Sequence, residues 1–127
     1  PFLIAATLRA VVAQRLVRLV CPDCAESEPL AEPLAQRLGL AAGTPVARAN
    51  GCDSCRHSGY QGLQGLFELI AVDGPVRALI GEGAAEDRLE AAGRRRSLVE
   101  SARAAVAGGR TTPTEVLPLF SGGGEAP

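Results

Sequence analysis

The only cysteines of the chain occur as two C-x2-C pairs, and this spacing is typical of metal-binding turns. Cys21 and Cys24 form the first pair, and Cys52 and Cys55 form the second. A two-residue gap lets both sulfurs of a pair turn toward one point, and the Pro-Asp and Asp-Ser dipeptides inside the gaps suit tight turns. Two pairs provide the four thiolates that tetrahedral Zn²⁺ binds at about 2.3 Å. The pattern predicts a structural zinc site with all four cysteines as ligands.

Other uses of these thiols remain open. A disulfide framework is expected in a cysteine-dense exported chain, and nothing in this sequence indicates export. A redox C-x2-C needs only one pair, whereas two closely spaced pairs favour joint ligation. An iron site, or a site that has lost its metal, would show the same spacing. We favour zinc, because four thiolates close its coordination shell and leave no position for water or substrate.

The expected site would carry a formal charge of +2 − 4 = −2, so hydrogen-bond donors should surround it. Backbone N–H groups of the two turns and the Arg56 side chain are the candidates. The lone histidine, His57, is expected to be a surface residue beside the turn rather than a ligand. The metal would close a loop of about thirty residues with little apolar bulk, so its binding energy would be folding energy.

The cysteines must be positioned by the elements around them, beginning with residues 1–20. At 100° per residue, Thr7, Gln14 and Arg18 fall within a narrow arc, and Arg15 flanks it. The rest of the circumference is apolar, which is typical of a helix that is buried on most sides. The pattern predicts a helix whose polar stripe carries Arg15 and Arg18 and whose residues 2 to 19 pack on a neighbouring domain.

The remaining sequence predicts an α+β fold that is mostly α. Residues 21–66 are expected to form the tetracysteine subdomain, with short strands, a helix from Pro33 to Leu38 that ends at Gly39, and a β-like run from Val46 to Ala49. Residues 67–120 read as the strand "LFELIAV" followed by a bundle of short helices, and residues 121–127 as a disordered tail. Asp73 is expected to cap one helix, and Thr112 with Glu115 has the spacing of a capping box.

Composition narrows the functional classes. The formal net charge of −1 over 127 residues gives no overall attraction to nucleic acid. The chain has no methionine and begins with proline, so we expect it to be a piece of a longer protein. It also lacks GxxxxGK[ST], so it has no phosphate-binding loop of its own.

Several motifs, in this order, resemble one known family. They are "AQRLVR" running into "CPDC", "GCDSC" followed by "GYQG", then "GLFE", and finally the "TTPTEV" entry to the last helix. They resemble the C-terminal region of the assembly ATPases of type II secretion systems and of their type IV pilus relatives, and they cover nearly residues 1 to 120.

The resemblance implies a cytoplasmic, hexameric RecA-type motor that hydrolyses ATP with Mg²⁺ in the parent chain. Such motors drive pseudopilus or pilus assembly and protein secretion through inner-membrane platform proteins. Residues 1–20 would belong to the ATPase core, which lies elsewhere in the parent chain, and the tetracysteine subdomain would bind zinc. We therefore expect a peripheral inner-membrane location through partners, no nucleic-acid partner, and no catalytic residue within this region.

Three further points remain open. Arg15 and Arg18 are expected either on a solvated or ion-paired face, or in contact with the nucleotide region or a neighbouring subunit. The run from Arg94 to Arg96 is interpreted as a solvated helix start, with binding of acidic phosphate or lipid headgroups as the minor alternative. A stand-alone zinc ribbon that binds protein or nucleic acid is the alternative function.

Overall fold

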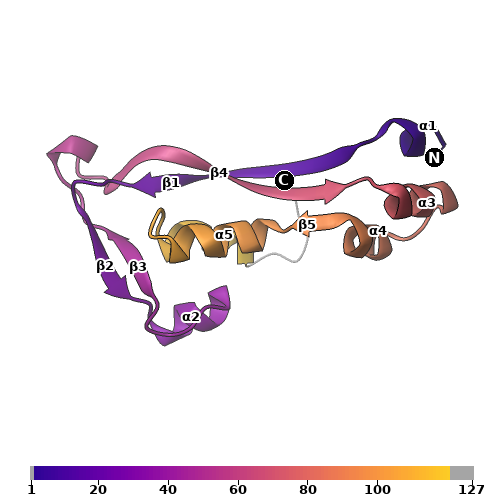
Figure 1. Ribbon diagram of the computed structural model, residues 1–127. Helices are drawn as coiled ribbons and strands as arrows, with labels where there is room; N and C mark the ends of the chain where they lie inside the picture. The colour runs from indigo at the N-terminus through magenta and orange to yellow at the C-terminus, as the bar shows by residue number, and fades with distance from the viewer. Residues whose placement is uncertain (1, 121–127) are drawn as a thin grey trace. The chain divides into compact units, whose positions relative to one another are not determined.

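The computed structural model describes residues 2–120, which form an α+β fold (Figure 1). The helices are α1 (Phe2–Thr7), α2 (Glu32–Leu38), α3 (Gly74–Glu82), α4 (Glu86–Gly93), α5 (Leu98–Ala107) and α6 (Pro113–Val116), with 3-10 turns η1 (Asp53–Cys55) and η2 (Leu117–Phe120). The strands are β1 (Ala10–Val20), β2 (Ala25–Pro29), β3 (Pro45–Ala49), β4 (Tyr60–Ala71) and β5 (Arg94–Arg96). The predicted α+β class is confirmed, whereas the tail predicted for 121–127 lies outside the described residues.

Two sheets organise these elements. One has three strands in the order β1-β4-β5, and the other is the antiparallel pair β2-β3. The β2-β3 register runs from Ala25 opposite Ala49 to Pro29 opposite Pro45, and α2 lies in the connection between the two strands (Figure 1). Within residues 2–120, no helix has the length and apolar character needed to cross a bilayer.

The helix predicted over residues 1–20 is wrong for most of its length. Helix α1 ends at Thr7, and residues from Ala10 to Val20 form β1 beside β4. A segment that is apolar on nearly every side cannot be assigned by periodicity alone, because a strand with two apolar faces gives the same pattern. The valines of this segment favour a strand, since their branched side chains are stiff at χ1.

The chain divides into two compact units that differ from the predicted subdomains. One contains residues up to Gln14 together with Phe67–Leu98, and the other contains Arg15–Leu66 together with the residues from Val99 onward. The predicted boundary at 66/67 falls inside β4, and α5 and α6 group with the cysteines rather than with α3 and α4.

The unit built from residues 2–14 and 67–98 packs α1 on α3 and α3 on α4. As predicted, Asp73 caps α3, and its carboxylate accepts from the Val76 N–H at 3.3 Å. The Arg77 guanidinium joins the unit's two stretches, because it donates to the carbonyls of Ala5 at 2.7 Å and Val72 at 3.2 Å.

The arginine run is a strand, not the predicted helix start. Strand β5 pairs antiparallel with β4, with a register irregularity between Leu69 and Ile70. Its arginines are not all free in solvent, because Arg94 pairs with Glu90 and Arg95 pairs with Asp73. The backbone hydrogen bonds to β4, a long-range interaction, outweigh the local helical preference of this run.

The unit that holds the cysteines has its own aliphatic core. Helix α2 ends as predicted at Gly39, which adopts a left-handed conformation at φ +63°. The Arg103 side chain of α5 donates to the Leu38 carbonyl at 2.6 Å and so ties the end of α2 to α5. The unit's most deeply buried aliphatic residues are Ala35, Leu38, Val46, Leu66, Ala102, Ala105, Val106 and Val116.

Two separate glycine-to-alanine variants test the packing of the unit built from residues 2–14 and 67–98. In Gly93→Ala the new Cβ would lie 2.7 Å from Ile70 and 3.1 Å from Val76, both through Cγ2 atoms. We expect a loss of about 1–3 kcal/mol in the free energy of unfolding, measured by urea titration. In Gly81→Ala, within α3, the methyl group meets open space. This control should gain about 0.5–1 kcal/mol, and equal stability of the two variants would contradict the packing described.

Candidate metal site

The four cysteines lie where strands begin and end. Cys21 directly follows β1 and Cys24 directly precedes β2, whereas Cys52 and Cys55 lie in the connection between β3 and β4. The β2-β3 pairing returns the chain to its starting point, because Ala25 is opposite Ala49. The second pair is thereby brought back beside the first.

The four sulfurs converge in the way the spacing predicts. All four Sγ atoms lie within 4.8 Å of one another, and all four cysteines are free thiols rather than disulfides. Three Sγ–Sγ distances are 3.9 Å for Cys21–Cys52, 3.8 Å for Cys24–Cys55 and 3.8 Å for Cys52–Cys55. A tetrahedron with 2.3 Å zinc–sulfur bonds has sulfur–sulfur edges of about 3.8 Å, so the residues present fit a metal of that size.

Each pair is shaped by a hydrogen-bonded turn. The Cys21 carbonyl accepts from the N–H groups of Cys24 at 3.3 Å and Ala25 at 2.9 Å. The Cys52 carbonyl accepts from the N–H of Cys55 at 3.2 Å and of His57 at 2.8 Å. The second turn is tight enough to hold two non-glycine residues at positive φ, Arg56 at 53° and His57 at 61°.

Two glycines beside the second pair are required by this geometry, and both lie in motifs quoted above, Gly51 in "GCDSC" and Gly59 in "GYQG". Gly51 has φ +100°, and a Cβ there would lie 2.6 Å from the His57 carbonyl oxygen. Gly59 has φ +78°, and a Cβ there would lie 2.7 Å from the Ala49 Cβ. Gly59 also joins the two turns, because its carbonyl accepts from the Cys21 N–H at 2.9 Å and its N–H donates to the Cys55 sulfur. The signal available in the sequence was a glycine on each side of the second cysteine pair.

Backbone N–H groups surround the sulfurs, as expected for an anionic site. The Gly51 N–H donates to the Cys24 sulfur at 3.3 Å. The Cys55 sulfur accepts twice, at 3.2 Å from the Cys52 N–H and at 3.2 Å from the Gly59 N–H. Arg56, the expected side-chain donor, is exposed and makes none of these contacts.

These surroundings shift the thiol pKa values in opposite directions. Burial raises the pKa of Cys21 and raises the pKa of Cys24 to about 12. Burial also acts to raise the pKa of Cys55, but the N–H groups of Cys52 and Gly59 outweigh it and lower that pKa to about 6. Metal binding requires thiolates, so binding here is coupled to the release of protons from Cys21 and Cys24.

The structure separates the two arginines that the helical pattern had placed together. In a strand, successive side chains alternate between faces, so Arg15 and Arg18 of β1 point to opposite sides. Arg15 is exposed. Arg18 instead pairs with Glu115 at 2.6 Å and lies 4.0 Å from the centre of the Tyr60 ring.

Arg18 holds the start of α6 against β1. Its backbone N–H also donates to Glu115 at 3.0 Å, and its carbonyl accepts from the Thr111 hydroxyl at 2.7 Å. The predicted capping box does not form, because Glu115 is engaged by Arg18 and the Thr112 hydroxyl bonds the Tyr60 hydroxyl at 2.9 Å. Arg18, which the helical pattern had placed on a polar stripe, is therefore an ion-paired residue of β1.

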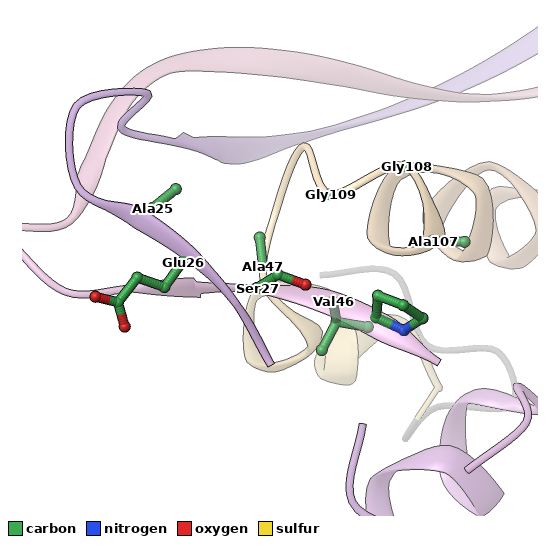
Figure 2. Close-up of a pocket in the computed structure, with 9 residues that line it drawn as sticks. Ala25, Glu26, Ser27, Val46, Ala47, Ala107, Gly108 and Gly109 are labelled. Carbon is green, nitrogen blue, oxygen red and sulfur yellow. The ribbon is translucent and has the colours of Figure 1, made fainter. Parts of the chain in front are cut away.

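Two other polar features lie near the turns, the His57–Asp53 pair and a hollow beside the β2-β3 strands. His57 is exposed and lies 3.1 Å from the Asp53 carboxylate, outside the cysteine cluster. A hollow of about 340 Å³ lies between the β2-β3 pair and the end of α5. Figure 2 shows the residues that line it. It is lined mostly by small side chains and backbone, and its one carboxylate, Glu26, pairs with Arg48 at 2.7 Å. Among residues 2–120, the four cysteines are the only cluster of His, Cys, Asp or Glu side chains suited to a metal.

Comparison with known proteins gives one consistent result. A family model described as "Type II/IV secretion system protein" matches residues 1–118. The "Type II secretion system protein E" of Dickeya dadantii is 44% identical over 86 residues, 68% of this chain and 17% of the relative. That of Pseudomonas aeruginosa is 36% identical over 121 residues, 92% of this chain and 24% of the relative.

The "Type II secretion system ATPase E" of Vibrio cholerae is 40% identical over 92 residues, 71% of this chain and 18% of the relative. The matched part of this chain therefore spans between 17% and 24% of the length of these three relatives.

Gly59 provides a test of how the turns are assembled. Gly59→Ala places a methyl group 2.7 Å from Ala49, between the two cysteine pairs. We expect Zn²⁺ affinity to fall about tenfold or more, because an overpacked site costs about 1–3 kcal/mol. Competition with a chromophoric chelator measures this. Gly43→Ala is the matched control, since φ there is also positive at +76° but no atom lies within 4 Å. Equal affinity in the two variants would contradict the close approach.

The Arg18–Glu115 pair gives a pH-dependent prediction. The hydrogen bond from Arg18 lowers the pKa of Glu115 from its ordinary 4.5. A depressed carboxyl pKa contributes stability above pH 4.5, and this contribution is lost as the pH falls through the folded-state pKa. Glu115→Gln should therefore lower the urea midpoint at pH 7, and the difference from wild type should shrink below pH 4.5. Glu82→Gln, at an exposed position of α3, is the control. A pH-independent difference would refute this account.

Proposed function

Because the chain belongs to the type II/IV secretion system protein family, we propose that it is the zinc-bearing C-terminal region of a type II secretion ATPase. The observation that carries the proposal is the convergence of four free cysteine sulfurs within 4.8 Å in a chain that matches this family over residues 1–118. Zn²⁺ held by Cys21, Cys24, Cys52 and Cys55 would stabilise the fold and take no part in catalysis, because four thiolates leave no open coordination position.

In this proposal the region is one part of a larger motor. ATP and Mg²⁺ would bind in the ATPase core of the parent chain, since no GxxxxGK[ST] occurs in these 127 residues. The parent would act as a cytoplasmic homo-hexamer that powers pseudopilus or pilus assembly and protein secretion through inner-membrane platform proteins. A net charge of −1 is consistent with protein partners and gives no support to a nucleic-acid partner.

An exposed apolar surface supports an attachment to further protein. Phe2, Leu3 and Ile4 of α1 are 80%, 75% and 56% exposed. Contiguous exposed apolar side chains of this size usually mark an interface. We propose that the ATPase core of the parent chain covers α1, and that the first twenty residues belong to that core in the assembled motor.

The proposed function is tested by segment exchange. The matching segment of the Vibrio cholerae type II secretion system ATPase E, 40% identical over 92 residues, is replaced by this chain, and secretion is measured in a strain that lacks the native ATPase. We expect secretion to be restored and about one Zn²⁺ per chain by elemental analysis. The double variant Cys24→Ser/Cys52→Ser should lose both the restored secretion and the bound Zn²⁺. Ser54→Ala changes a residue in the second turn that is not a ligand, so this control should keep both.

The two parts of the proposal fail separately. A folded protein without zinc contradicts the metal site. A zinc-loaded exchange protein that is stable in cells but does not secrete contradicts the assigned function.

A further inference from the structure

The unit built from residues 2–14 and 67–98 contains another hollow, which we call the aliphatic pocket. It has a volume of about 350 Å³, and α1, β1, β4, α3 and α4 all contribute to its walls. Eight of its ten lining residues are Ile, Leu or Val, and the other two are glutamates of α4. Every lining residue belongs to this one unit, so the pocket is complete without the unit that holds the cysteines.

The aliphatic pocket stays open because no aromatic side chain fills it. The unit has two aromatic residues, Phe2 and Phe67, and both are exposed and do not line the pocket. Its lining runs from the buried side chain of Val76 to the exposed side chain of Val11, so a molecule in solution can reach it. A hollow of this volume, with aliphatic walls and few polar groups, is typical of sites that bind small molecules.

The charged side chains that line the pocket are all acidic. Glu86 and Glu90 lie one helical turn apart on α4. Glu90 already has a partner, because the Arg94 guanidinium donates to it at 2.5 Å. The Glu86 side chain is exposed and has no hydrogen-bond or ion-pair partner within residues 2–120. The three groups carry a formal charge of −2 + 1 = −1, which leaves one carboxylate at the edge of the pocket uncompensated.

This uncompensated charge decides the class of ligand. An anionic ligand would place a second negative charge beside Glu86, and a neutral apolar ligand would leave that carboxylate without a partner. A cationic head group would pair with Glu86 while an apolar chain is buried against the aliphatic walls. Arg77 of α3 cannot supply this cation, because its guanidinium is held by the carbonyls of Ala5 and Val72.

We propose that the aliphatic pocket is a binding site for a small amphiphilic amine, a molecule with one apolar chain and a terminal ammonium group. The chain lies against Val76 and Leu89, and the ammonium group pairs with Glu86. The site is separate from the cysteines, and its ligand is neither a nucleotide nor a metal.

The pocket shares only one residue with the apolar surface of α1 that we assign to contact with the ATPase core. Ile4 belongs to both, whereas Phe2 and Leu3, which are more exposed, do not line the pocket. A ligand can therefore occupy the pocket while Phe2 and Leu3 contact the core. The inference does not depend on the proposed function.

The test uses hexylamine as the probe, with 1-hexanol and hexanoate as its neutral and anionic analogues. Each is titrated into the isotope-labelled chain at neutral pH, and the backbone amide chemical shifts are followed by NMR. We expect hexylamine to bind with a dissociation constant on the order of a millimolar, from burial of its chain. The shifts should concentrate in α1, α3 and α4. Binding should be about three- to fivefold weaker for 1-hexanol and about tenfold weaker for hexanoate.

Two pairs of matched variants locate the ligand. Glu86→Gln removes the charge with little change in volume, and hexylamine affinity should fall about three- to fivefold. Asp87→Asn, at the next residue of α4 and outside the lining, should change the affinity less than about twofold. Val11→Phe fills part of the pocket with a ring and should weaken binding about tenfold or more. Val12→Phe is its control, because Val12 points to the opposite face of β1 and does not line the pocket.

Each variant is first checked by urea titration, and the exposed positions chosen should leave the chain folded. No saturable binding of hexylamine, or binding of hexanoate that is equally tight, overturns the proposal. Equal affinities of Glu86→Gln and Asp87→Asn contradict the role of Glu86. Unchanged binding in Val11→Phe places the ligand elsewhere and contradicts the assigned pocket.

Discussion

The approach of the two cysteine pairs through Gly59 is the contact on which the metal-site region depends. The carbonyl of Gly59 holds the first turn through the Cys21 N–H, and its own N–H bonds the Cys55 sulfur in the second turn. Strands β1 and β4 are thus tied together at the point where the cysteines gather. The aliphatic residues of this unit are small or medium in size, so polar contacts must supply much of its organisation.

A second polar connection extends from this point to the last helices. Arg18, three residues before Cys21, contacts Glu115, Tyr60 and Thr111. The Tyr60 hydroxyl, at the start of β4, bonds Thr112. Strands that leave the cysteine cluster are therefore linked to α6, which explains why the C-terminal helices group with the cysteines rather than with the helices that precede them.

Local signals in the sequence predicted local features correctly. The cysteine spacing indicated convergence, Gly39 marked the end of α2, and Asp73 marked the start of α3. The failures all involve distant partners. Strand β1 depends on β4, and Glu115 is drawn away from its capping role by Arg18, 97 residues earlier. Neither partner is visible in a window of neighbouring residues, so periodicity and capping rules could not identify them.

The discontinuous make-up of the cysteine-bearing unit bears on how the protein is synthesised. The turns and the β2-β3 pair are complete once Tyr60 has emerged from the ribosome, but α5 and α6 arrive only after the 32 residues Phe67–Leu98 of the other unit. Until then, Leu38 and Val46 lack part of the core that buries them in the finished protein. A nascent chain with such exposed apolar side chains is prone to misassembly. Early closure of the cysteine turns would limit the time during which that half-built unit is vulnerable.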